Sequence, residues 1–83
     1  MIEPTASPRG MIEHIAKALV DAPGEVIVDE YEDGDEMVIE LEVAEADVGK
    51  VIGRSGRVAR AFRTVLSAAG VKLDKRYALE IIE

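Results

Sequence analysis

The most informative stretch of this 83-residue sequence is Gly49-Lys50-Val51-Ile52-Gly53-Arg54-Ser55-Gly56-Arg57. Apolar residues with helical spacing stand on both sides of it, so two helices are expected to meet at the loop 53–56. Glycine at each end of the loop tolerates a positive φ and lets another molecule approach the backbone closely. Residues 55–57 also begin the second helix, where free amides and the helix dipole favour phosphate. The stretch predicts either a phosphate-binding corner or a plain helix–helix turn, which favours glycine as well.

Helical spacing extends on both sides of this corner. Before it, residues 45–52 form a short helix whose acidic residues lie in the first turn, where the helix dipole favours them. After it, a longer helix is expected over about 57–69, with Gly70 just beyond its end. The core stripe of that helix consists of Val58, Phe62, Val65, Leu66 and Ala69.

The first half of the chain predicts one helix and a hairpin. Ser7 and Pro8 are typical of a helix start, and Ala22-Pro23-Gly24 is expected to end that helix. Two strands follow, over 25–31 and 36–43, joined by a turn at Asp33-Gly34. A last strand is expected over 76–82, where apolar and polar residues alternate.

The expected order of elements is α-β-β-α-α-β. Two helices separate the second strand from the third, and that crossover is long enough to make the two strands parallel. The sequence therefore predicts an α+β fold with a three-stranded mixed sheet and its helices on one face. Residues 8–83 form a single domain in this interpretation, and residues 1–7 form a flexible leader.

Charge is distributed unevenly along the chain. The net charge is −7, and residues 25–47 hold eleven Asp or Glu and no Lys or Arg. Residues 50–63 hold five basic residues and no acid. The local field, rather than the net charge, guides a polyanion to a patch. The basic run fits a nucleic-acid patch or a solvated helix face that balances an acidic sheet.

Composition excludes several classes of protein. The chain contains no cysteine, which excludes disulfides and thiolate metal sites. The first ten residues hold no apolar run, and we expect a cytoplasmic protein with no membrane segment. Asp29-x-Tyr31-x-Asp33-Gly34 imitates a calcium loop, but Tyr31 occupies a ligand position and a hairpin explains the pattern better. No residues assemble an enzyme site, and no cofactor, metal or small-molecule substrate is expected.

The quoted stretch resembles the V-I-G-x-x-G signature of KH (K-homology) domains, in the type II, bacterial order of elements. It is most similar to the small single-KH proteins of the KhpA family. Their pattern Asp-x-Gly-x-Val-Ile-Gly-x-x-Gly-Arg corresponds to Asp47–Arg57. Their Ala-x-Arg-Thr corresponds to Ala61–Thr64, and their final strand to Leu79–Ile81. The resemblance covers about residues 10–83.

The resemblance implies a single-stranded RNA site in which the loop 53–56 clamps about four nucleotides. The implied site residues are Val48, Gly49, Lys50, Ile52, Gly53, Arg54, Ser55, Gly56, Arg57, Val58 and Arg60. Val48, Ile52 and Val58 would line an apolar floor for bases, and the basic residues would meet phosphates. Ser55 departs from the long polar residue common there, although its hydroxyl could cap the next helix.

The resemblance also implies partners. A KhpA-like protein is expected to act as a small global RNA chaperone or regulator. It is also expected to form a homodimer, or a heterodimer with a larger KH protein of the KhpB or Jag type. The alternative is a protein-interaction module with weak or no RNA binding. A thin core and exposed sheet edges make association plausible.

Overall fold

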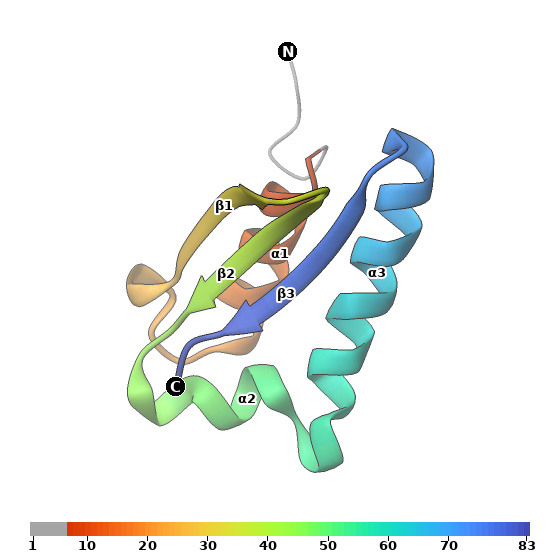
Figure 1. Cartoon of the computed structure of the whole chain (residues 1–83). Helices are drawn as coiled ribbons and strands as arrows, with labels where there is room; N and C mark the ends of the chain where they lie inside the picture. The colour runs from red at the N-terminus through yellow and green to blue at the C-terminus, as the bar shows by residue number, and fades with distance from the viewer. Residues whose placement is uncertain (1–6) are drawn as a thin grey trace.

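The computed structural model describes residues 7–83, and its elements confirm the predicted order (Figure 1). The helices are α1 (Pro8–Leu19), α2 (Val48–Ile52) and α3 (Arg57–Leu73), and the strands are β1 (Ile27–Asp33), β2 (Glu36–Glu42) and β3 (Arg76–Ile81). Single 3₁₀ turns, η2 to η4, occupy Pro23–Glu25, Glu45–Asp47 and Arg54–Gly56. The predicted leader 1–7 lies outside the described residues except for Ser7.

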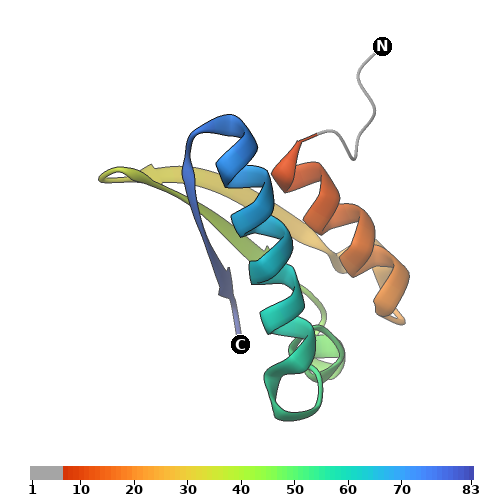
Figure 2. The same cartoon turned by 90° about the vertical axis from the view of Figure 1, so that its right-hand side faces the viewer.

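The three strands form one mixed sheet in the order β1-β2-β3. β1 pairs with β2 antiparallel, with Val28 opposite Leu41, and β2 pairs with β3 parallel, with Ile39 opposite Leu79. Helices α1 and α3 both lie on one face of this sheet, as the view from the side shows (Figure 2). The long crossover between β2 and β3 therefore produces the expected parallel pair and the expected single helical layer.

Helix α1 begins as predicted and ends earlier than predicted. The Ser7 hydroxyl accepts a hydrogen bond from the Gly10 amide at 2.9 Å, and Pro8 occupies the first helical position. The helix ends at Leu19, before the Ala22-Pro23-Gly24 signal. The reason is tertiary, because the amides of Asp21 and Ala22 donate to the distant Asp47 carboxylate instead of to helical carbonyls.

Three other predicted boundaries differ from the structure. β1 begins at Ile27, because Pro23–Glu25 forms a 3₁₀ turn. The hairpin loop is Gly34-Asp35, one residue later than predicted, so Gly34, with φ of 66°, holds its first position. α3 continues through Gly70 to Leu73, where Asp74, in the left-handed conformation, ends it. Gly70 is buried inside the helix because the Lys75 carbonyl lies where a Cβ would stand.

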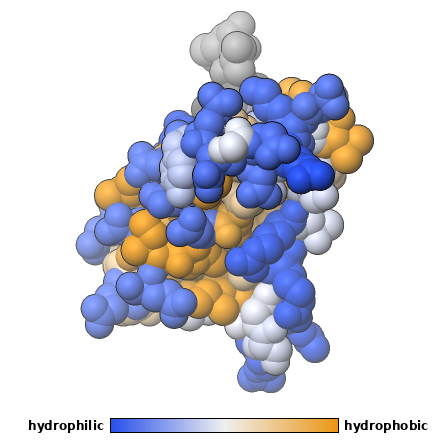
Figure 3. All heavy atoms as spheres, viewed as in Figure 1, coloured by the Kyte–Doolittle hydropathy of each residue, from blue (hydrophilic) through white to orange (hydrophobic). Residues whose placement is uncertain are grey.

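The core lies between the helices and the inner face of the sheet. Its fully buried side chains include Ile12, Ile39, Leu41, Val51 and Leu66, which come from all three helices and from β2. The sheet face away from the helices has a different character. Polar residues cover its hairpin end, and an apolar area lies toward the C-terminal end of β3 (Figure 3).

Candidate nucleic-acid interface

The corner between α2 and α3 has the backbone that its glycines predict. Gly53 has φ 78° and ψ 169°, Ser55 has φ 58°, and Gly56 has φ 75°. Three of the four loop residues thus lie at positive φ, where side chains are disfavoured. A Cβ on Gly53 would also stand 2.5 Å from Val58 Cγ2. The first glycine is therefore required by both conformation and space.

Two adjacent amides at this corner remain available. The Gly53 amide donates to the Gly49 carbonyl at 2.9 Å, and the Gly56 amide donates to the Gly53 carbonyl at 3.1 Å. Within residues 7–83, the amides of Arg54 and Ser55 donate to no other part of the chain. They precede the amino end of the 17-residue helix α3, whose dipole favours an anion.

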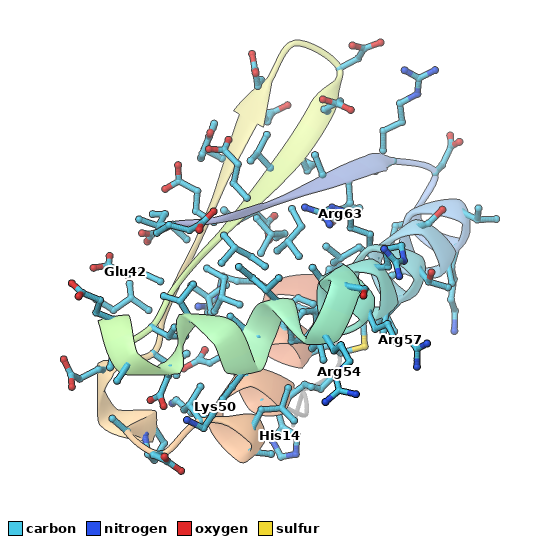
Figure 4. All side chains as sticks on the ribbon, turned by 90° about the horizontal axis from the view of Figure 1, so that it is seen from below. His14, Glu42, Lys50, Arg54, Arg57 and Arg63 are labelled. Atoms are coloured by element: carbon cyan, nitrogen blue, oxygen red, sulfur yellow. The ribbon has the colours of Figure 1, made fainter. Side chains whose placement is uncertain are left out.

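The arginines complete this anion site in two ways. Arg54 and Arg57 are exposed and point away from the body of the protein (Figure 4). Arg60 instead donates from Nη1 to the Ser55 carbonyl at 2.8 Å, so it holds the loop in shape. The Ser55 hydroxyl does not cap α3 as predicted, because Gly56 occupies the N-cap position.

A groove of about 390 Å³ runs beside the corner, between α3 and the end of β3. Its apolar part comes from Ile52, Ala59, Leu79 and Ile81, and its charged part from Arg60 and Arg63 on α3 and from Glu80 and Glu83 on the strand side. Arg63 lies on the sheet side of α3, unlike Arg54 and Arg57 (Figure 4). A groove with an apolar floor, arginines on one wall and carboxylates on the other can hold a base inside and a phosphate at its basic rim.

The open edge of β3 adds hydrogen-bonding groups to this groove. The Ile82 amide donates to the Leu41 carbonyl at 2.9 Å, so residue 82 and the other even-numbered residues of β3 turn their backbone toward β2. In a strand, alternate residues turn their backbone groups to opposite sides. The amides and carbonyls of Leu79 and Ile81 therefore face the open edge, where the groove lies.

The structure brings most of the predicted site residues together. Gly53, Arg54, Ser55 and Arg57 form the exposed corner, while Ile52, Gly56 and Arg60 line the groove. Gly49 is exposed on α2. Three predicted residues do not line the groove: Val48 and Val58 pack against the core, Val58 beside Gly53, and Lys50 pairs with Asp21 and Asp47.

Sequence reasoning missed the far half of the groove. Ala59, Leu79, Ile81 and the acidic residues Glu80 and Glu83 line it but were not predicted as site residues. Arg63 was noted only as part of the basic run. Its position three residues after Arg60, on the same helix face, was the signal that could have placed it in the site.

Asp47 fixes the position of the corner. Its carboxylate is 2% exposed and accepts hydrogen bonds from the Ala22 amide at 3.0 Å, the Asp21 amide at 3.3 Å and Lys50 Nζ at 3.2 Å. Burial acts to raise the pKa of Asp47, but the two backbone hydrogen bonds and Lys50 outweigh it and lower the pKa. Lys50 Nζ also lies 3.2 Å from Asp21 Oδ2. Its hydrogen bonds to the Asp47 and Asp21 carboxylates, with Asp47 the larger cause, raise the pKa of Lys50. These hydrogen bonds connect the segment after α1 with the start of α2.

Two kinds of feature are absent from the residues that the structure describes. No helix within residues 7–83 is long and apolar enough to cross a membrane. Over the same residues, no group of three or more His, Asp or Glu side chains is arranged to hold a metal ion.

The α-β-β-α-α-β order, together with a Gly-x-x-Gly corner beside an edge strand, defines a type II KH domain. Comparison with known sequences gives the family. The sequence model of the KhpA/KhpB KH domain matches residues 9–81, and the chain belongs to this family.

Individual relatives support the assignment. RNA-binding protein KhpA of Clostridium acetobutylicum is 53% identical over 87% of this chain and 96% of its own length. The protein of the same name from Treponema pallidum is 53% identical over 88% and 91% of the two chains, and that from Aquifex aeolicus is 51% identical over 90% and 95%. The resemblance to the KhpA family is therefore confirmed.

Solved structures support the fold. Aquifex aeolicus Era bound to GDP and aluminium fluoride matches 89% of this chain with a TM-score of 0.58 and 17% identity. Era in complex with MgGDPNP and nucleotides 1506–1542 of 16S ribosomal RNA matches equally well. The chain spans only 29% and 28% of those two chains, and at this identity the likeness concerns the fold alone.

Proposed function

We propose that this chain binds single-stranded RNA, with a phosphate seated on the corner and bases lying in the groove. The observation that carries the proposal is the pair of unoccupied amides of Arg54 and Ser55 at the start of α3. The names of the curated relatives, all RNA-binding protein KhpA, support the same ligand. In the cell the chain would act in the cytoplasm as a small RNA chaperone or regulator.

The chemistry of the site favours contact with the RNA backbone over strict reading of sequence. Arg54, Arg57, Arg60 and Arg63 offer about three or four phosphate contacts, whereas Lys50 is already paired with Asp21 and Asp47. For a single strand each contact contributes about −0.7 to the salt slope. Affinity should therefore fall roughly 20- to 50-fold between 50 and 200 mM salt.

The test replaces the loop centre with acids. Arg54→Asp combined with Ser55→Asp places negative charge against the phosphate, and binding of a fluorescein-labelled single-stranded RNA should fall by at least about 100-fold. The matched control, Arg76→Asp combined with Ser67→Asp, makes the same charge change at exposed positions away from the corner. Fluorescence anisotropy measures the affinities, and circular dichroism checks the fold. Equal affinities for the two double variants would show that the corner is not the site.

A separate observation supports a second candidate function, which is pairing with another KH protein. An apolar groove of about 480 Å³ lies between α1 and α3, and Leu73 at its end is 49% exposed. Its lining is Pro8, Met11, Val65, Ala68, Ala69, Lys72 and Leu73. A second copy of the chain, or a KhpB- or Jag-like partner, would cover this groove.

Light scattering over a concentration series tests the pairing. Ala68 is exposed in the groove, and Ala68→Arg should shift the particle from dimer to monomer without changing the melting temperature. A parent protein that stays monomeric at every concentration, both alone and with a KhpB-like partner, would contradict this function.

A further inference from the structure

The sheet face away from the helices carries a pattern that the proposed RNA site shares only at Glu80, which also lines the groove. Val28, Ile39, Leu41 and Leu79 point into the core. The alternate residues of each strand must therefore point to the other side. We call this side the outer sheet face. It consists of Ile27, Asp29, Tyr31 and Asp33 of β1, the even-numbered residues of β2 and β3, and Ile82 beyond β3.

Three carboxylates lie side by side across this face. Asp29 pairs with Glu40, and Glu40 pairs with Glu80, so one row across the sheet is wholly acidic. Like charges directly opposite on neighbouring strands destabilise a sheet. Among residues 7–83, only Tyr31 donates a hydrogen bond to that row, with its hydroxyl 3.4 Å from Glu80 Oε2, and no basic side chain pairs with it.

Exposed apolar side chains flank the acidic row on both sides, in an apolar row toward the hairpin and in a mixed row toward the other end. Toward the hairpin, Tyr31, Val38 and Ala78 are cross-strand neighbours, with Tyr31 40% exposed and Val38 only 4% exposed. Toward the other end, Ile27 (50% exposed) and Ile82 (41% exposed) lie on either side of the exposed carboxylate of Glu42, which pairs with Ile27. The apolar area at this lower end is visible on the face, with polar residues around it (Figure 3).

The acidic field on this face is strong enough to affect Tyr31. Partial burial is the largest cause of the raised pKa of its hydroxyl, and the nearby Glu80 and Glu40 carboxylates raise this pKa further. A negatively charged ligand would meet the same repulsion. The face therefore disfavours RNA, and it equally disfavours the same face of a second copy.

We propose that the outer sheet face docks a basic amphipathic helix of a protein partner. Such a helix satisfies both features at once, because its Lys or Arg side chains neutralise the Asp29–Glu40–Glu80 row while its apolar side chains cover the flanking rows. The described residues hold no metal-binding group that could neutralise the row instead. This site does not depend on the RNA-binding corner.

The spacing of the rows defines the partner helix. The two rows that flank the acidic row are four residues apart along β1, from Ile27 to Tyr31, or about 13 Å. A helix rises 1.5 Å per residue, so apolar side chains eight residues apart are about 12 Å apart along its axis and come within reach of both rows. The basic side chain then stands about four residues after the first apolar one, on the same side of the helix.

The probe is a synthetic helical peptide with this spacing, with Leu about eight residues apart and Arg midway between them. Its control is a scrambled peptide of equal composition. Calorimetry measures affinity, and ¹⁵N amide shifts locate the contact. Glu40→Gln with Glu80→Gln should weaken binding about fivefold, while the charge-matched pair Glu25→Gln with Glu45→Gln should not. Shifts should concentrate on Ile27–Tyr31, Val38–Glu42 and Ala78–Ile82.

A separate variant tests the exposed apolar side chains. Ile27→Thr with Ile82→Thr keeps β-branching and charge but removes apolar area, and it should weaken binding about tenfold at an unchanged melting temperature. Equal binding of the scrambled peptide, or equal loss in the two Gln pairs, would overturn the proposal. So would self-association of the protein alone that the face variants abolish, because a second copy would then be the occupant.

Discussion

Gly53→Ala is the substitution for which the structure gives the sharpest expectation. Gly53 has φ 78° and ψ 169°, a region that only glycine occupies without strain. Its added Cβ would lie 2.5 Å from Val58 Cγ2 and 2.8 Å from the Val58 backbone nitrogen. Gly56 is the matched control, since its φ of 75° and ψ of 17° are left-handed helical and the nearest atom to its Cβ is Arg60 Nη1 at 3.5 Å.

The two costs can be estimated separately. At Gly53 the backbone strain is about 1–3 kcal/mol. The overlap with Val58 adds about 1–3 kcal/mol, for a total of roughly 2–6 kcal/mol. A domain of this size has a free energy of unfolding of about 4–12 kcal/mol. At Gly56 the left-handed cost of about 1–2 kcal/mol is offset by about 0.4–1 kcal/mol from the stiffer unfolded chain.

Urea denaturation followed by circular dichroism measures both variants against the parent. Gly53→Ala should lose roughly 2–3 kcal/mol more than Gly56→Ala. If Gly53→Ala does not fold, the double variant Gly53→Ala with Val58→Ala should recover part of the stability, because it removes the contact with Val58 Cγ2 and leaves those with the nitrogen and Cβ of residue 58. Equal losses in the two glycine variants would refute the claim that the first glycine of the loop is fixed by space as well as by conformation.

Two further expectations concern the supports of the corner. Asp47→Asn should lower the melting temperature at pH 7 by roughly 5–10 °C, because the Asp21 and Ala22 amides lose a charged acceptor. Because the pKa of Asp47 is lowered in the folded protein, this stabilisation is present above the ordinary carboxyl pKa and disappears as pH falls through the pKa of the folded state. The melting temperatures of the parent and of Asp47→Asn should therefore converge below about pH 4. A difference between them that persists at acid pH would contradict this explanation. Gly70→Ala should lower the free energy of unfolding by about 1–3 kcal/mol in urea denaturation, because the added Cβ meets the Lys75 carbonyl. A rise of about 1 kcal/mol, as expected for an exposed helical glycine, would show that this close approach is wrong.

The sequence predicted those parts of the fold that depend on neighbours along the chain. The Ser7-Pro8 helix start follows from capping chemistry within one turn. The parallel pairing of β2 with β3 agrees with a crossover that is long enough to allow it. The Gly53–Gly56 corner was also predictable, since positive φ is a local demand that glycine meets.

Contacts between distant segments could not be predicted in the same way. Lys50 belongs to the basic run, yet its ammonium lies 3.2 Å from Asp21 Oδ2, a residue after α1. Gly70 has the sequence appearance of a helix end, but the return of the chain at Lys75 buries it inside α3.

The sequence by itself determined the order of elements, the family and the glycine corner, because each depends on spacing within a few residues or on residue type. Only the tertiary structure placed Leu79 and Ile81 opposite Arg60 and Arg63, and only the strand register aligned Asp29–Glu40–Glu80 across one face. The groove and the outer face are formed by residues far apart in the chain, whose adjacency is set by strand pairing and helix packing rather than by any local pattern.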